Sequence, residues 1–152
     1  MTVSITGGCR CGHNRYSINT DAATQMICHC EGCYKRSGPY MGGLFFLTKA
    51  ITFSGERHRY TDVGGTGCSL EILACKECGS IFGVVPEAVP LVTVITANSL
   101  DDQKQFNPLF HNWAGSKPTW VTINDNLPQF EKSVDWEQLG GRPDFGTESM
   151  RC

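Results

Sequence analysis

The sequence predicts a mainly β fold of small antiparallel sheets with few short helices, and three observations carry this prediction. Short stretches rich in β-branched and aromatic residues recur along the chain, with Gly, Pro, Asn and Asp between them. Apolar patterns with the 3.6-residue helical period are weak, so helices are expected only as accessories. The length of 152 residues fits one domain that can bury its own core.

Strands are expected where apolar residues alternate or run together between turn formers, at 2–6, 13–18, 26–30, 43–49, 51–55, 68–75, 81–85, 91–96 and 119–123. Short helices are expected at 31–37, 99–106 and 133–140. In the second of these, Ser99 would be the N-cap, with Asp101 and Asp102 in the first turn. The residues from 141 onward are polar and rich in turn formers, which predicts a loosely held tail. We therefore expect a main domain over 1–132 and a C-terminal helix and tail over 133–152.

The charges nearly cancel, with 13 basic and 15 acidic residues. A balanced surface of this kind argues against nucleic acid and anionic membranes as partners. No secretory signal pattern opens the chain, and the longest strongly apolar run, Leu44 to Leu47, is too short to cross a bilayer. The expectation is a cytoplasmic protein that acts on small molecules, with its oligomeric state left open.

Nine cysteines in a reducing compartment favour metal binding or thiol chemistry over a disulfide framework. "CKECG" places Cys75 and Cys78 at a spacing that turns both thiolates toward one metal, and the following Gly permits the tight turn. "CRCG" offers a second pair, Cys9 and Cys11, with the same closing Gly. Together the two pairs would complete a four-thiolate site, which is a structural arrangement because no coordination position remains for a substrate.

"CHCEGC" leaves three thiolates, Cys28, Cys30 and Cys33, without an obvious fourth ligand. Three protein ligands with an open position are the arrangement that zinc adopts where chemistry is done. His29 would point away from its neighbours if the segment is extended, so it is not expected to be the fourth ligand. A thiolate-rich zinc ion is a poor activator of water, and it is better suited to accept another thiol and hold it as the nucleophile.

Other interpretations of the three cysteines stay open. Cys68 or Cys152 could complete a second structural site, or the cluster could share ligands with the first metal. Two of the three thiols could instead cycle to a disulfide as a redox centre. Taken singly, Cys68 is expected to be a small buried hydrophobe and Cys152 to be free.

The order of "GGCRCG", "CHCEGCYKRSG", "CKECGS", "SLDDQKQFNPLFHNW" and "SKPTWVTINDNLPQF" closely resembles the glutathione-dependent formaldehyde-activating enzyme family, to which centromere protein V is also related. The resemblance runs from about Gly7 to Phe130. It implies a β-tent fold organised around a structural zinc at the four cysteines, with a labile, catalytic zinc at Cys28, Cys30 and Cys33. It also implies a carbon-sulfur lyase-type activity that joins glutathione and formaldehyde.

This sequence departs from the family pattern at Tyr34, Ile72, Ala74 and Asn98, and it lacks a longer N-terminal extension. These differences leave the metal ligands unchanged but put the thiol substrate in doubt, because basic residues would hold the carboxylates of glutathione.

Four further residues are candidates for substrate binding. Lys35 and Arg36 directly follow the three cysteines, and His111 and Trp113 alternate in a stretch that could form a pocket wall. The same residues could equally be surface cations and a core His beside a packing Trp. The leading hypothesis is an enzyme with two zinc ions that joins or cleaves a small thiol and an aldehyde. The alternative is a non-catalytic two-zinc binding module.

Overall fold

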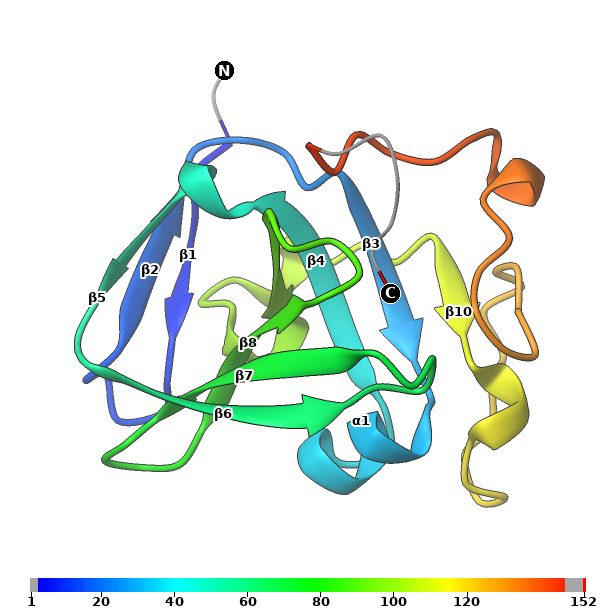
Figure 1. Cartoon of the computed structure of the whole chain (residues 1–152), viewed down its shortest axis with the longest axis horizontal. Helices are drawn as coiled ribbons and strands as arrows, with labels where there is room; N and C mark the ends of the chain where they lie inside the picture. The colour runs from blue at the N-terminus through cyan, green and yellow to red at the C-terminus, as the bar shows by residue number, and fades with distance from the viewer. Residues whose placement is uncertain (1–2, 147–151) are drawn as a thin grey trace.

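A computed structural model describes residues 3–146 and 152, in which ten strands form two sheets and one α-helix is present (Figure 1). The smaller sheet is antiparallel and has the order β1-β2-β5, with bounds Ile5–Gly8, Arg15–Ile18 and Ile51–Ser54. The mainly β fold that the sequence predicts is therefore confirmed.

The larger sheet has seven strands in the order β10-β3-β4-β9-β8-β7-β6. In chain order its bounds are β3 Thr24–Cys28, β4 Met41–Leu47, β6 Arg57–Val63, β7 Ser69–Cys75, β8 Ile81–Pro86, β9 Val92–Thr96 and β10 Phe110–Asn112. All its pairings are antiparallel except one: β10 lies parallel to β3. The long connection from β9 carries the chain back to the free edge of β3, so β10 enters in the same direction as its neighbour.

The two sheets share one core. Tyr16 and Ile18 of the smaller sheet pack with Leu44, Phe82 and Ile95 of the larger one, and all five are almost fully buried. Such dense burial of large side chains is the main stabilising contribution to a domain of this size. A second cluster of buried residues lies around the end of β3 and contains the three cysteines Cys28, Cys30 and Cys33.

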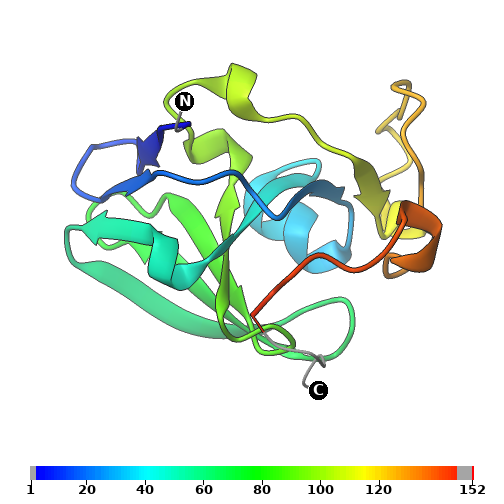
Figure 2. The same cartoon turned by 90° about the horizontal axis from the view of Figure 1, so that it is seen from above.

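The helix expected over 31–37 is confirmed as α1, Glu31–Ser37. Cys30 is its N-cap, and its sulfur accepts a hydrogen bond from the backbone N–H of Cys33 at 3.4 Å. Gly38 ends the helix at φ 100°, which favours glycine. The helix packs beside β4 at one end of the larger sheet (Figure 2).

Several expected elements differ from the structure. Residues 119–123 form no strand, since Trp120 is 73% exposed and the chain there has no strand neighbour among the described residues. The stretch 99–106 contains only 3-10 turns, at Ala97–Ser99 and Gln103–Gln105, so Ser99 caps no α-helix. Asp101 instead accepts hydrogen bonds from Thr6 and Arg15.

The C-terminal segment also differs from the expectation. The helix expected over 133–140 is a single 3-10 turn at Glu137–Leu139. Phe145 is only 1% exposed and packs against Phe45 and Trp136, with ring centroids 5.7 Å apart in both pairs. The expectation of a loosely held tail is therefore wrong as far as Phe145, because the ring of this residue is buried against apolar side chains of the larger sheet.

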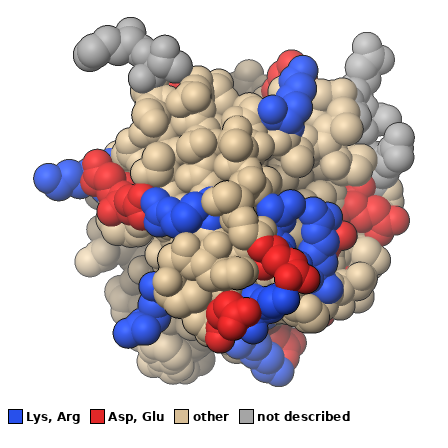
Figure 3. All heavy atoms as spheres, turned by 90° about the vertical axis from the view of Figure 1, so that its left-hand side faces the viewer, with Lys and Arg blue, Asp and Glu red and all other residues tan. Residues whose placement is uncertain are grey.

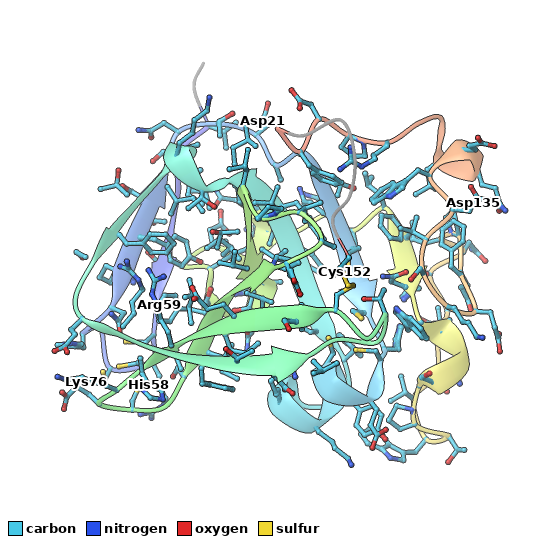
Figure 4. All side chains as sticks on the ribbon, in the orientation of Figure 1. Asp21, His58, Arg59, Lys76, Asp135 and Cys152 are labelled. Atoms are coloured by element: carbon cyan, nitrogen blue, oxygen red, sulfur yellow. A yellow bond between two sulfur atoms is a disulfide. The ribbon has the colours of Figure 1, made fainter. Side chains whose placement is uncertain are left out.

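The cysteines outside the clusters form a disulfide. Cys68 is bonded to Cys152, with the two Cα atoms 5.9 Å apart (Figure 4). The expectation that Cys152 is free and Cys68 a simple buried hydrophobe is wrong. The pair is separated by 84 positions, so no local spacing could have indicated it.

Charges of both signs are interspersed on the face of the molecule that carries the smaller sheet (Figure 3). Lys76 pairs with Glu56, and Arg59 pairs with Glu71 at 2.8 Å. Arg59 and Lys76 both lie toward this side of the molecule (Figure 4). In the part of the chain that the structure describes, no helix is long and apolar enough to cross a bilayer.

Candidate metal centre

The four-cysteine cluster consists of Cys9, Cys11, Cys75 and Cys78, whose sulfurs all lie within 4.8 Å of one another. The first two follow β1 in the smaller sheet, and the other two lie at the end of β7 and in the turn after it. The Sγ atoms of Cys9 and Cys11 are 3.6 Å apart, and those of Cys11 and Cys75 are 3.7 Å apart. Four thiolates at this spacing could hold one metal ion tetrahedrally, and such an ion would join the two sheets.

The turns around this cluster follow from its glycines. Gly12 and Gly79 come directly after their cysteine pairs and have φ values of 81° and 75°. Only glycine adopts this conformation at no steric cost, so each turn can bring two sulfurs to the same point. Hydrogen bonds from Ser80 lower the pKa of Cys78 to about 5, so this thiol is readily available as a thiolate ligand.

The three-cysteine cluster consists of Cys28, Cys30 and Cys33, and its sulfurs also lie within 4.8 Å of one another. Cys28 is the last residue of β3, Cys30 caps α1, and Cys33 lies in the first turn of that helix. All three are buried. Because the backbone changes from strand to helix within three residues, the three sulfur atoms are brought close together.

The proton affinities of these thiols separate strongly. Hydrogen bonding with Cys28 and Cys33 lowers the pKa of Cys30 to about 2, and the positive charge of Arg36 acts in the same direction. Hydrogen bonds with Cys30 and Cys33, together with burial, raise the pKa of Cys28 well above its usual value, and the pKa of Cys33 is raised to about 12. One thiolate that is stabilised by two protonated neighbours is a donor set suited to a soft divalent cation, which would favour ionisation of all three.

All three cysteines line a cavity of about 270 Å³, which we call the apolar cavity. It lies where α1, the end of β3, the β6–β7 turn and the C-terminal segment meet. Its wall is largely aliphatic, aromatic and thioether, formed by Met26, Met41, Phe45, Leu70, Val84, Val89, Val94, Phe110, Trp113, Val134, Trp136 and Phe145. Leu70 at one end of β7 lines this cavity, whereas Cys75 of the four-cysteine cluster lies at the other end of the strand.

Two polar side chains in the wall have buried atoms without a hydrogen-bond partner among the described residues. These atoms are Nη2 of Arg36 and Oδ1 of Asn112. The Arg36 side chain is 10% exposed and forms an ion pair with Asp62 through its other terminal nitrogen. It folds back over Gly32, where a Cβ atom would lie 3.1 Å from Nη1. Buried polar groups are normally satisfied, so these two are candidates to bind the polar part of a ligand.

Of the four residues that the sequence suggests for substrate binding, two line the apolar cavity. Arg36 and Trp113 do, whereas Lys35 and His111 do not. Lys35 is exposed and pairs with Glu31 at 2.6 Å, one helical turn earlier. The two cations are adjacent on α1, so their side chains point in different directions and only one of them reaches the cavity.

Trp113 and His111 do not share a face, because the strand ends between them. Trp113 has φ 57°, a left-handed conformation that turns its ring out of the alternation of β10. The ring lies against Gly65 of the β6–β7 turn, where a Cβ atom would come within 2.8 Å. Asn112, which sequence reasoning passed over, takes the position beside Cys28.

His111 belongs to a buried chain of hydrogen bonds. Its Nδ1 lies 2.8 Å from Nε2 of His29, and its Nε2 lies 2.8 Å from Oδ2 of Asp125. Both imidazole side chains are almost fully buried. As the sequence predicts, His29 is not part of the three-cysteine group that could hold a metal; its Nε2 is hydrogen-bonded to His111 instead. The chain of hydrogen bonds fastens the loop between β3 and α1 to β10.

The alternative in which Cys68 or Cys152 completes the three-cysteine cluster is not supported, since these two are bonded to each other. Cys28, Cys30 and Cys33 are free thiols in the structure. The three-cysteine cluster therefore stands as a set of three donors facing a cavity.

Residues 4–116 match the sequence profile of a family described as glutathione-dependent formaldehyde-activating enzyme. The chain belongs to this family. Both cysteine clusters lie within the matched residues, whereas Val134, Trp136 and Phe145 of the cavity wall lie beyond them. The comparison with curated proteins gave no match. Membership points to chemistry related to glutathione and formaldehyde, and the cysteine clusters are compatible with metal binding.

Proposed function

We propose that this family member is a zinc-dependent, carbon-sulfur lyase-type enzyme that joins or cleaves a small thiol and an aldehyde such as formaldehyde at Cys28, Cys30 and Cys33. One observation carries the proposal: the three cysteines of this cluster, whose sulfurs lie within 4.8 Å of one another, all line the apolar cavity. The four-cysteine cluster provides a complete tetrahedral donor set of its own. Chemistry is therefore assigned to the set that leaves a coordination position open.

The donor atoms support zinc at both clusters. Thiolates are soft ligands that select zinc over hard cations such as Mg²⁺ or Ca²⁺. We assign a structural zinc to Cys9, Cys11, Cys75 and Cys78, and a labile zinc to Cys28, Cys30 and Cys33. The protein would then hold two zinc ions in each chain, of which the second is more easily lost because it has one protein ligand fewer.

When bound, zinc at the three-cysteine cluster would lower the pKa of an incoming thiol, so that its sulfur is present as a thiolate near neutral pH. The sulfur lone pair then forms the C–S bond at the carbonyl carbon of the aldehyde. The π electrons of the C=O bond move to oxygen, which takes up the proton that the thiol released. Nothing is oxidised or reduced, and the reverse sequence cleaves the adduct.

We assign Arg36 and Asn112 to the oxygen of the adduct, because both line the cavity and have a buried polar atom without a partner among the described residues. The free Nη2 of Arg36 can donate a hydrogen bond to the oxygen as it gains negative charge. The side-chain amide of Asn112 can accept a hydrogen bond from the hydroxyl that results. The ion pair with Asp62 fixes the guanidinium in place, so little reorganisation is needed when the charge develops.

The partners are then a small-molecule thiol and an aldehyde, with glutathione and formaldehyde as the pair that the family description names. We propose the cytoplasm as the place of action, because free thiols in the two clusters need a reducing environment to remain metal ligands. The Cys68–Cys152 disulfide would there have to resist reduction, as structural disulfides of low reduction potential do.

The test replaces zinc by Co²⁺ and records the absorption spectrum while a thiol is added to the reduced protein. Two cobalt ions per chain are expected, and one set of thiolate bands should change as the thiol enters the open position. If both cobalt sites are indifferent to thiols, the non-catalytic binding module replaces the enzyme.

Variants then connect the site to turnover, measured as formation of the thiol-formaldehyde adduct by NMR. Cys30→Ser should abolish turnover and remove one of the two metals. Arg36→Gln should lower the rate about 100-fold, which is typical of the loss of one donor to a developing oxyanion. Lys35→Gln is the matched control, since it removes a cation from the same helix outside the cavity and should leave the rate within about twofold.

A further inference from the structure

The apolar cavity is the space beside the three-cysteine cluster that the organic substituent of a bound thiol would occupy. All three cysteines of the cluster are among the residues that line it. A thiol held through a metal at these three cysteines would therefore have its first carbon atoms near the cavity side chains. The chemistry of these side chains decides which thiols fit, and this argument rests on the function proposed above.

The cavity offers little to a charged thiol. Arg36 is the only charged side chain in its wall, within the described residues, and it already pairs with Asp62. Glutathione carries two carboxylates and one ammonium group, and each would lose water on entry. Burying a charge without a partner is strongly unfavourable, and one shared guanidinium cannot satisfy two carboxylates.

The open depression beside the cavity does not make the binding of a charged thiol more favourable. Its wall contains Lys35 and Arg36, but it also contains Glu31 and Asp62, so its formal charges cancel. Each cation there is already paired with one of these carboxylates. A tripeptide thiol that reached into this depression would have to compete with existing ion pairs.

The cavity instead suits an aromatic group. Phe110, Trp113 and Trp136 contribute ring surfaces to its wall, and Met26 and Met41 add polarisable thioethers that pack well on aromatic rings. The volume of about 270 Å³ exceeds the roughly 150 Å³ of an apolar cavity that binds benzene. A phenyl ring with a short linker to the sulfur would fit.

Part of this wall comes from outside the family match. Val134, Trp136 and Phe145 lie beyond residue 116, where the match ends. Trp136 meets Phe110 edge to face, with ring centroids 5.7 Å apart, and it also packs on Phe145. The cysteines of both clusters therefore belong to the family segment, whereas residues 133–145 contribute part of the cavity wall from outside it.

From these observations we infer that the thiol substrate carries an uncharged apolar substituent, aromatic by preference, and that residues 133–145 select it. The reaction is the addition described above with this thiol in place of glutathione. The new bond joins its sulfur to the aldehyde carbon, and the proton of the thiol ends on the aldehyde oxygen.

The experiment uses the tryptophan fluorescence of the full-length, zinc-loaded protein. Trp113 and Trp136 line the cavity, whereas the third tryptophan, Trp120, is exposed and can be replaced by Phe to remove its signal. Phenylmethanethiol and glutathione are titrated separately. We expect phenylmethanethiol to bind at least about tenfold more tightly than glutathione, because burying a phenyl ring contributes more free energy than a tenfold change in affinity requires.

Benzyl alcohol, which lacks the thiol, is the probe for the cavity alone. It should quench the same fluorescence more weakly and leave the cobalt spectrum unchanged. Val134→Lys would place a cation in the apolar wall and should reverse the preference toward glutathione. Val3→Lys, at a 42% exposed position outside that wall, adds the same charge and should change neither affinity.

Two failures are distinguishable. If glutathione binds more tightly than phenylmethanethiol and changes the cobalt spectrum, the inference on the substituent is overturned while the proposed function stands. If neither thiol changes the cobalt spectrum, the proposed function and the inference both fail, whatever benzyl alcohol does in the cavity.

Discussion

Replacement of Phe145 by Ala tests whether the C-terminal segment is part of the fold. The ring is 1% exposed and packs against Phe45 and Trp136 at 5.7 Å between centroids. A buried aromatic side chain hides about 150 to 250 Å² of surface, which at about 25 cal/mol per Å² corresponds to about 4 to 6 kcal/mol as an upper estimate. Truncations of buried Phe to Ala cost about 3 to 5 kcal/mol. We expect the free energy of unfolding to fall by about 3 to 4 kcal/mol.

The measurement is urea unfolding of the zinc-loaded protein, followed by far-UV circular dichroism with the disulfide intact. Leu109→Ala is the control, since Leu109 is 55% exposed and its truncation should cost less than about 0.5 kcal/mol. A loosely held tail would make the two variants equal. A loss below about 1 kcal/mol for Phe145→Ala would refute the packing argument and, with it, the place of this residue in the cavity wall.

Three further predictions concern other parts of the molecule. Burial, only partly offset by the hydrogen bond with Ser99, raises the pKa of Tyr16 to about 12, so this phenol ionises at lower pH in the unfolded chain than in the folded protein. The free energy of unfolding should therefore fall by up to about 3 kcal/mol as pH rises from about 10 to 12. Urea unfolding at a series of pH values measures this, and Tyr16→Phe should remove most of the pH dependence. Cys75→Ser should remove the structural metal and the cooperative thermal transition, measured by metal analysis and calorimetry, and retention of both would contradict the assignment. Thiol titration of the unreduced, denatured protein should find seven free thiols, and Cys152→Ser should add one; nine in the wild type would rule out the disulfide.

The local chemistry of the metal ligands could be predicted from the sequence. Spacings such as those of Cys75 and Cys78, or of Cys30 and Cys33, place sulfurs together through the geometry of a single turn. The glycines after the pairs are equally local, since a positive φ is a property of one residue. Both features can therefore be predicted from a few neighbouring residues, without knowledge of the rest of the chain.

The walls of the cavity could not be predicted in this way. Phe145 is an isolated aromatic residue among turn formers, and no periodicity marks it as buried. The choice between Lys35 and Arg36 depends on which of two adjacent helical positions faces the β6–β7 turn, which is a tertiary property. The parallel strand β10 was unexpected for the same reason, because its partner β3 lies more than 80 residues earlier.

The parallel pairing of β10 with β3 also bears on the open coordination position proposed for the three-cysteine cluster. In the observed register Asn112 lies opposite Cys28, and His111 faces away from the cavity into its buried chain of hydrogen bonds. Because side chains alternate along a strand, a slip of one residue would exchange the two faces of β10. It would turn the imidazole of His111 toward the three cysteines, where it could serve as a fourth ligand and close the proposed metal site. The register of this three-residue strand would therefore keep the proposed metal site open, and insertions in this family member should be tolerated before Phe110 but not within β10.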